Sequence, residues 1–364
     1  YANLKVNNKA PKGSSPEYYD SIKLKTQQEV NFFRKSSAYK YATQGMLNYY
    51  KLSIERMLSL LNENGSMGVI CPSSLFGDLS SKNLRSHMIN NFSFTSIKYF
   101  PEKASLFENI TQSTVIFHLN NSGPTEKIDI TLNDDHFQVN RDSIVYSFPD
   151  SLEIPFIPKL GWDVLNKLNK FDTIANKSYL RNKRGELDLS LYKEMITEED
   201  TGYRLVRGNL IKASGLKSDR NEFVLKDEFV NKKSRDYISN DFEKVRIIGQ
   251  QISNVDTLKR LNFVLCDSSD ILANSCNYIT VTEKEVCKTG LLILLNSYLL
   301  NWRFKITSSN NHINNYEIDT LPIVEEINEL SRLNDMETIK KEVFICELYG
   351  LNKKETEYII NYHK

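Results

Sequence analysis

The sequence lacks the patterns that would make a zinc site, a disulfide scaffold or a membrane span. It has only five histidines, scattered along 364 residues, and no C-x-x-C pair. Its five cysteines are Cys71, Cys266, Cys276, Cys287 and Cys346. This usage predicts reduced, mostly buried thiols in a cytosolic protein and no bound metal. The longest apolar stretch, residues 290–295, is far too short to cross a bilayer, and no signal peptide is seen, so no membrane partner is expected.

The chain also lacks an excess of charge of one sign. Its formal net charge is only +1, although 26% of its residues are charged. Apolar residues make up 40% of the chain and aromatic residues 11%, enough for a large buried core and for two domains rather than one. A surface for nucleic acid must therefore come from local segregation of charge.

Charge is indeed segregated in the second half of the chain. Residues 201–260 contain 13 Lys and Arg against 8 acidic residues, a local net charge of +5. Residues 317–364 contain 11 acidic residues against 6 Lys and Arg, a net charge of −5. Local positive charge is what phosphate binding requires, but Lys-rich surfaces are often only solvated, so both interpretations stay open.

Apolar periodicity predicts an α/β unit in the first third of the chain. The expected elements are a helix at 44–63, a buried strand at 67–71, a helix at 82–90 and strands at 94–100 and 113–119. This order suits the closing part of an α/β sheet with an antiparallel hairpin at its edge. Further elements are a β-rich connector at 124–158, a helix at 162–169, a strongly apolar helix at 289–304 and a helical, acidic tail at 324–364.

Several stretches resemble the amino-methyltransferases of restriction–modification systems. They are QGMLNYYKLSIERMLSLLNENGSMGVICPSSLF at 44–76, LRSHMI at 84–89 and SLFENITQSTVIFHL at 105–119. The branch resembled is that of type IIG and type IIS adenine methylases, which carry the recognition domain in the same chain. Residues 294–323 resemble the end of their target-recognition domain, and residues 347–359 resemble their closing helix.

The resemblance implies the C-terminal half of an adenine-N6 DNA methyltransferase. Its fold class would be α/β: the C-terminal part of a Rossmann-like methyltransferase sheet, then a mixed α+β target-recognition domain and a helical tail. The expected parts are the catalytic segment 1–123, the connector 124–158, the recognition domain 159–323 and the tail 324–364. The implied partners are double-stranded DNA of a specific sequence, a missing N-terminal methyltransferase half, and a restriction endonuclease domain or subunit, all in the cytoplasm.

The cofactor-binding half of that family has no counterpart in this sequence. It should carry a Gly-rich turn and an acidic residue for the ribose of S-adenosylmethionine, yet the chain contains no G-x-G. The catalytic tetrapeptide Asn/Asp-Pro-Pro-Tyr should lie just before the polar loop at 5–16, so only its last residue could be present, as Tyr1. We therefore expect S-adenosylmethionine to serve the complete enzyme, and this chain alone to bind no cofactor and to be inactive.

Methylation of adenine N6 requires that the base first leave the duplex. Flipping costs roughly a few kcal/mol, and stacking on an aromatic side chain returns about 1–3 kcal/mol. By resemblance, Tyr1 supplies one stacking face and Phe107, in the loop before the strand 113–119, supplies the other. The alternative for Phe107 is an ordinary hydrophobic anchor of its loop.

Three residues follow the strand 67–71 at its C-terminal end, where ligands of open α/β sheets bind. They are Pro72, Ser73 and Ser74. We expect them to line the pocket for the adenine or the cofactor. The alternative is that the serines only cap the next helix.

Two polar segments of the recognition domain are candidates for DNA contact. The candidate residues are Arg204, Arg207, Asn209, Lys212, Lys217 and Arg220 in the first segment, and Arg303, Lys305, Asn310, Asn311, His312 and Asn314 in the second. Asn suits pairing with adenine and Arg suits guanine, although Asn and Ser also dominate ordinary loops. We expect the two segments to meet, with the helix 289–302 buried and the acidic tail packed away from this face.

Three classes of function compete for this sequence. The first is part of a methyltransferase, the second is a DNA-binding specificity module without catalysis, and the third is an endonuclease domain. The stretch 44–119 favours the first, because a pure specificity module has no use for it. No convincing cluster of carboxylates with a nearby lysine supports the nuclease.

Overall fold

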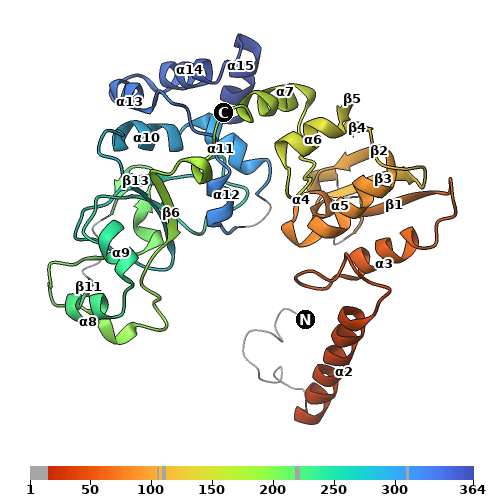
Figure 1. Cartoon of the computed structure of the whole chain (residues 1–364), viewed down its shortest axis with the longest axis horizontal. Coiled ribbons are helices and arrows are strands. Elements are labelled where there is room, and N and C mark those ends of the chain that lie inside the picture. Colours follow the sequence, from red (N-terminus) through yellow and green to blue (C-terminus); the bar gives the residue numbers. More distant parts are fainter. Residues whose placement is uncertain (1–14, 105, 109–111, 218–221, 309–310) are drawn as a thin grey trace. The chain divides into compact units, whose positions relative to one another are not determined.

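The computed structural model describes residues 15–104, 106–108, 112–217, 222–308 and 311–364. The chain divides after Ile154 into two compact units, and each combines helices with β-sheet (Figure 1). The protein is therefore a mixed α/β chain with several small sheets. Three expected site residues, Tyr1, Arg220 and Asn310, lie outside the described residues.

The first unit holds a five-stranded sheet and a set of helices. Its helices are α2 (Pro16–Lys35), α3 (Tyr49–Leu58), α4 (Ser74–Gly77), α5 (Lys82–Asn91) and α6 (Arg141–Ser147). Its strands are β1 (Ser66–Pro72), β2 (Ser93–Phe100), β3 (Thr114–Asn120), β4 (Lys127–Leu132) and β5 (Asp135–Asn140). The strands expected in the connector at 124–158 are β4 and β5, and both belong to this sheet.

The strand order in this sheet is β1-β3-β2-β4-β5. Strand β3 pairs antiparallel with both β1 and β2, whereas β2 and β4 run parallel. The hairpin of β2 and β3 was expected at the edge of the sheet, but β3 lies between its two neighbours. The physical reason is the crossover through α5, which returns β2 parallel to β1 and leaves a one-strand gap that β3 fills.

The two faces of the sheet differ in their cover. On one face the Phe76 ring of α4 contacts the rings of Phe94 and Phe117, at 5.7 and 5.8 Å between centroids, and helices α4, α5 and α6 gather there (Figure 1). The opposite face carries the cross-strand pair Ile70 and Ile116, which are 54% and 38% exposed. The strand expected to be buried thus exposes alternate residues, because successive side chains of a strand point to opposite faces and the face that carries Ile70 and Ile116 is less covered.

The helix expected at 44–63 is shorter than its apolar periodicity suggests. Helix α3 begins after Asn48, whose side chain accepts the N–H of Tyr50, and ends at Leu58. The preceding turn contains Gly45 at φ +69°, a left-handed conformation that interrupts a helix. Glu55 of α3 accepts the N–H groups of Tyr41 and Ala42, so the turn is tied to the helix.

The second unit is built around a four-stranded antiparallel sheet of order β13-β12-β15-β6. Its strands are β6 (Leu180–Arg184), β12 (Ile247–Gln250), β13 (Phe263–Leu265) and β15 (Cys276–Val281). Three small two-stranded sheets pair β7 (Ile196–Thr197) with β11 (Phe223–Val224), β8 (Leu205–Val206) with β14 (Ile271–Leu272), and β9 (Ile211–Lys212) with β10 (Gly215–Leu216).

Helices surround this sheet and include the acidic tail. They are α7 (Lys159–Leu168), α8 (Lys226–Asn231), α9 (Arg235–Asn240), α10 (Lys288–Leu295), α11 (Tyr298–Lys305), α12 (Asn315–Asp319), α13 (Ile327–Leu330), α14 (Thr338–Leu348) and α15 (Lys353–Tyr362). The tail helices α13, α14 and α15 pack on α10, α11 and α7. The tail is therefore part of the second unit and covers its apolar helices.

The single apolar helix expected at 289–304 is two helices. The break falls at Asn296, whose side chain bonds both the N–H and the carbonyl of Phe263, at 2.9 and 2.8 Å. Ser297 then caps α11 by accepting the N–H of Leu300. A polar side chain that pairs with a strand and a new N-cap end the first helix, although the apolar spacing runs on.

The described residues include all five cysteines and the helices listed above. All five cysteines are free and four of them are buried. No helix among the described residues is both long enough and apolar enough to cross a membrane.

Candidate active site and nucleic-acid interface

The turn Pro72–Ser74 and the loop that carries Phe107 leave the sheet at the same edge. Pro72 of β1 and Phe100 of β2 both pair with Thr114 of β3, so the three lie in one row. The N–H of Ser73 donates to the carbonyl of Ser113 at 3.0 Å. The loop between Phe100 and Ser113 therefore starts and ends beside the turn that follows β1.

The side chains of Ser73 and Ser74 form hydrogen bonds with residues outside helix α4. Ser73 occupies the N-cap position of α4, but its side chain makes no capping bond there. Its hydroxyl bonds the Ser113 hydroxyl, while the Ser74 hydroxyl lies 3.2 Å from the phenol oxygen of Tyr50. Burial raises the pKa of Tyr50, so this phenol keeps its proton. The serines tie α3, α4 and β3 together at the sheet edge.

Phe107 lies in this loop with 47% of its surface exposed. A hydrophobic anchor would be expected to lose most of its surface to neighbours, whereas a stacking side chain must keep a face free. The exposure is compatible with stacking on a base. The roles of Phe107 and of Pro72, Ser73 and Ser74 stay predictions.

Several basic side chains of the second unit are engaged inside the domain. Arg204 forms a two-pronged ion pair with Asp270, with both N–O distances 2.9 Å. Arg207 does the same with Glu222, at 2.6 and 2.8 Å. Such pairs fix the planar guanidinium and neutralise its charge. Because Asp270 lies outside residues 201–260, the net charge of that stretch overstates the positive charge that a phosphate would meet.

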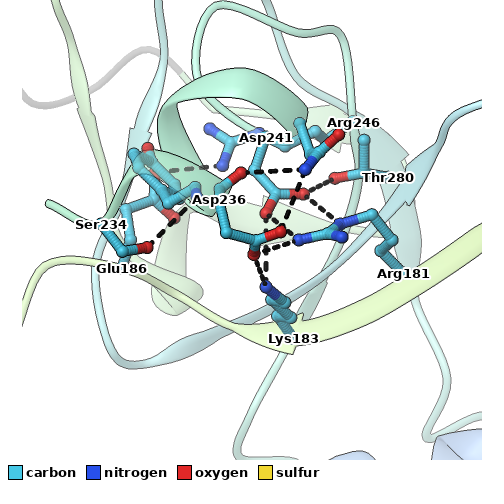
Figure 2. A network of polar contacts seen from close by, with 10 residues as sticks. Arg181, Lys183, Glu186, Ser234, Asp236, Asp241, Arg246 and Thr280 are labelled. Carbon is cyan, nitrogen blue, oxygen red and sulfur yellow. Dashed lines mark hydrogen bonds and ion pairs between the residues drawn. The ribbon is translucent and has the colours of Figure 1, made fainter.

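A polar network at the end of β6 uses further basic residues (Figure 2). Asp241 is fully buried and accepts from Thr280 at 2.7 Å and from Arg181 at 3.2 Å. Arg181 and Lys183 also bond Asp236 of α9, at 2.6 and 3.0 Å, and hold the pKa of that carboxyl at about 2. These pairs join β6, α9 and β15.

A second part of the network is deeper in the domain (Figure 2). The buried guanidinium of Arg246 donates to Glu186 at 3.0 Å, and the same carboxylate oxygen accepts the hydroxyl of Tyr237 at 3.0 Å. Burial and the nearby carboxylate raise the pKa of Tyr237 far above its ordinary range. This cluster holds the segments around β6 and β12 together.

The second polar segment contributes to the fold more than its composition suggests. Arg303 is buried, and Asn314 caps α12 through Glu317. Lys305 donates to the carbonyl of Thr257 at 2.7 Å, and the Asn311 side chain accepts the N–H of Val255 at 2.9 Å. Both of these side chains reach the chain between β12 and β13.

Five of the candidates are exposed, and the two segments come together near the end of β12. The exposed candidates are Asn209, Lys212, Lys217, Asn311 and His312. The side chain of Gln250 donates to Ile211 O at 2.6 Å, and the N–H of Ile313 donates to Gln251 O at 2.8 Å. One segment therefore lies against Gln250 and the other against the next residue.

Sequence reasoning missed two features at this place. One is the chain from 251 to 262, which connects β12 and β13, and the other is the exposed Arg184 at the end of β6. The first contains Asn254, Asp256 and Thr257, a polar loop composition that could have been noticed. Among the described residues, no group of three or more His, Cys, Asp or Glu side chains is placed so that it could hold a metal ion.

Two family descriptions match the chain in the order expected. Residues 16–107 match the Eco57I restriction-modification methylase, and residues 203–323 match the TaqI-like C-terminal specificity domain. The first match includes Pro72, Ser73, Ser74 and Phe107. The second includes every DNA-contact candidate. Among curated proteins, no significant match is found.

Solved structures of restriction–modification enzymes are also similar. The type IIG restriction endonuclease BpuSI is 12% identical, with a TM-score of 0.38 over 97% of this chain and 52% of its own. The type IIL restriction-modification enzyme MmeI, solved in complex with DNA, is 10% identical, with a TM-score of 0.46 over 87% of this chain and 50% of its own. The chain spans about half the length of each. The chain therefore carries a segment that matches an Eco57I-type restriction-modification methylase, followed by a segment that matches a TaqI-like specificity domain.

Proposed function

We propose that this chain is part of a site-specific DNA adenine-N6 methyltransferase of a restriction–modification system. The first unit would supply the base-flipping side of the active site, and the second would bind a specific sequence of double-stranded DNA. The observation that carries this proposal is the presence of a methylase segment and a specificity domain in one chain. A specificity module without catalysis does not explain the methylase segment.

The geometry of the first unit supports a role beside a flipped base. Phe107 and the turn Pro72–Ser74 leave the sheet at one edge, which lies at the C-terminal ends of β1 and β2. Ligands of open α/β sheets bind beyond such ends. A base that has left the stack needs an aromatic face at this place to recover part of the cost of flipping.

Adenine N6 is a weak nucleophile because its lone pair is delocalised into the ring. In the family that this chain resembles, an Asn or Asp side chain and a proline carbonyl accept hydrogen bonds from the amino group. The methyl group is then positioned in line with the nitrogen, so that positioning does most of the work. The part we assign to this chain is to hold the base, not to donate the methyl group.

S-adenosylmethionine would supply that methyl group, but the residues present here do not fit it. The chain has no G-x-G turn. Two surface hollows, of about 420 and 550 Å³, are lined by residues around Tyr49 and around Arg141, and neither lining includes Ser73, Ser74 or Phe107. We therefore assign no cofactor contact to this chain and place cofactor binding in a separate methyltransferase half.

The open edge of the first sheet suits the docking of such a half. Within the described residues β1 pairs only with β3, and its Ile70 is more than half exposed. An apolar edge strand exposes unpaired backbone groups, and an added strand would satisfy them. We propose that the cofactor-binding half extends this sheet into a Rossmann-like one. The free thiols agree with a cytoplasmic location, and an endonuclease domain or subunit would complete the system.

DNA binding and base modification test the proposal separately. The chain should bind duplex DNA with an affinity that falls steeply as salt rises, which fluorescence anisotropy measures. Assembled with a cofactor-binding half, it should place N6-methyladenine in one sequence context of plasmid DNA, as read by sequencing that detects modified bases. Detection of N4-methylcytosine instead would show that the target base is cytosine and not adenine. The absence of modified bases from an assembled, DNA-binding enzyme would leave only the specificity module.

A further inference from the structure

The connection between β12 and β13, residues 251–262, forms an exposed loop of the specificity domain. We call it the β12–β13 loop. Ile252 and Leu258 are 58% and 51% exposed, and the polar side chains of Asn254, Asp256 and Thr257 are exposed between them.

Buried side chains hold the C-terminal part of this loop. Asn301 of α11 is fully buried, and its side-chain oxygen accepts the N–H groups of Arg260 and Leu261, at 2.8 and 3.1 Å. Its nitrogen donates to Leu258 O at 2.8 Å. The buried guanidinium of Arg260 donates to the hydroxyl of Ser308 at 2.9 Å. The base of the loop is thus anchored in the core.

The middle of the loop is held as well. Asn311 accepts the N–H of Val255, and Lys305 donates to Thr257 O. Within the loop, the Asn254 side chain accepts the N–H of Asp256 at 2.9 Å, a turn that fixes the direction of the chain there. Bonds from outside therefore reach the loop backbone on both sides of Asp256. A loop ordered before binding loses less conformational entropy when it binds.

Positive charge lies on both sides of the loop. Gly249 of β12 pairs with Phe263 and with Asn277, and Asn277 pairs with Arg184, so the loop and the exposed Arg184 share one end of the sheet. On the other side the β9–β10 hairpin, with exposed Lys212, packs against β12 and β13. Phosphates on the two strands of a groove would meet these cations while the loop lies between them.

We propose that the β12–β13 loop enters a groove of duplex DNA and that Asp256 reads a base there. The proposal rests on the DNA-binding function proposed above. A carboxylate only accepts hydrogen bonds, and the amino group of cytosine N4 is the donor that acidic side chains read in the major groove. Arg184 and Lys212 bind phosphates and offset the repulsion between these and Asp256. Lys305 and Asn311 are positioning residues, because they hold the loop backbone.

The test is selection of bound duplexes from a pool with a randomised centre. The full chain should enrich a motif with cytosine preferred at one position. Asp256→Asn should lose that preference by about 5- to 150-fold and keep the rest of the motif. Asp267→Asn is the matched control, because this exposed carboxylate follows the far end of β13. It should enrich the same motif as the unaltered chain.

A second variant separates positioning from folding. Asn311→Ala should weaken the preference at the same base position while the melting temperature and the salt dependence of binding stay unchanged. A motif identical to that of the unaltered chain in both Asp256→Asn and Asn311→Ala overturns the assignment of the loop. Binding of the unaltered chain without any sequence preference also overturns it and leaves DNA binding intact. Failure to bind any duplex would instead overturn the proposed function, and the loop assignment with it.

Discussion

At the scale of single residues, exposure and pairing decide what each side chain can do. Phe107 is half exposed, while the buried Arg246 and Glu186 are committed to each other. The same residue types would look equally functional in the sequence. Three side chains therefore lead to predictions that separate a role in binding or catalysis from a role in stability.

Phe107→Ala in the assembled methyltransferase should slow methyl transfer. The free energy of the productive complex should rise by about 1–3 kcal/mol, because the flipped base loses one stacking face. Binding to the duplex should change little, since phosphate contacts hold the DNA before flipping. Single-turnover methylation and anisotropy measure the two effects. Leu106→Ala, a similarly exposed neighbour, is the control. A lower melting temperature of Phe107→Ala with normal turnover per folded molecule would identify an anchor.

Glu186→Ala should destabilise the second unit by about 3–5 kcal/mol, because it leaves the guanidinium of Arg246 buried without its carboxylate. Both tryptophans, Trp162 and Trp302, lie in that unit, so tryptophan fluorescence during urea unfolding follows it alone. Glu337→Ala removes an exposed ion pair with Lys340 and should change stability by about 0–1 kcal/mol. Equal midpoints for the two variants would contradict this prediction.

Glu342 should make the stability of the second unit depend on pH. Burial raises the pKa of this carboxyl to about 7, while Tyr298 N–H, Lys259 and Lys341 favour the charged form less strongly. The folded state therefore holds the proton more tightly than the unfolded chain does. Stability is highest below pH 4.5 as far as this group is concerned, and it falls by roughly 3 kcal/mol as pH rises to 7 and above.

The variant Glu342→Gln should remove this dependence, because an amide does not titrate and can still accept the N–H of Tyr298. Urea unfolding at pH 5 and pH 8, followed by tryptophan fluorescence, measures the difference. The variant should be more stable than the unaltered chain at pH 8. A slope with pH that is unchanged in Glu342→Gln would mean that other groups cause it.

At the scale of elements, close packing of helices depends on small residues. Gly290 of α10 faces α13, and a methyl group added there would lie 1.9 Å from the carbonyl oxygen of Ile327. Backbone atoms on a neighbouring element cannot turn aside as a flexible side chain can. Helices α10 and α13 would have to separate before any larger residue could fit.

Gly290→Ala should therefore cost about 1–3 kcal/mol or more, despite the higher helix propensity of alanine. Gly77→Ala is the matched control, because Gly77 is also helical and a methyl group there would meet no atom within 4 Å. Thermal unfolding followed by circular dichroism compares the two. A Gly290→Ala protein as stable as Gly77→Ala would show that α13 yields without cost.

At the scale of the whole molecule, the chain has a methylase sheet in which β1, among the described residues, pairs with β3 alone, and a specificity domain with a four-stranded sheet of its own. We expect no measurable binding of S-adenosylmethionine to this chain alone, because it has no Gly-rich turn for the cofactor. Calorimetry is the measurement, with the assembled enzyme as the positive control. Micromolar binding of S-adenosylmethionine to the isolated chain would refute the proposal that the other methyltransferase half binds the cofactor.

The sequence by itself determined the family, the order of the two parts and the start or end of most of the principal elements. These follow from local signals, namely apolar spacing, the residues at strand ends and short sequence motifs. Such signals lie in neighbouring residues and do not depend on tertiary contacts. The strands β2 and β3 and the helix α5 lie within a residue or two of their expected positions. The helices expected at 44–63 and 289–304 rested on apolar spacing alone, and the structure shortens the first and divides the second.

Only the tertiary structure decided which polar residues remain available. The sequence predicts Arg204, Arg207 and Arg303 as DNA contacts, and that stays a prediction; in the structure two have carboxylate partners and one is buried. Asp270 is 66 residues from Arg204, and Glu222 is 15 residues from Arg207. The sequence offers several acidic residues as partners for each arginine and does not indicate which one pairs with it. The break between α10 and α11 and the position of β3 also depend on a residue or strand brought from elsewhere. Ion pairs, hydrogen bonds and strand pairs form between residues that are close in space. Neither the composition of the chain nor the spacing of residues along it gives these distances.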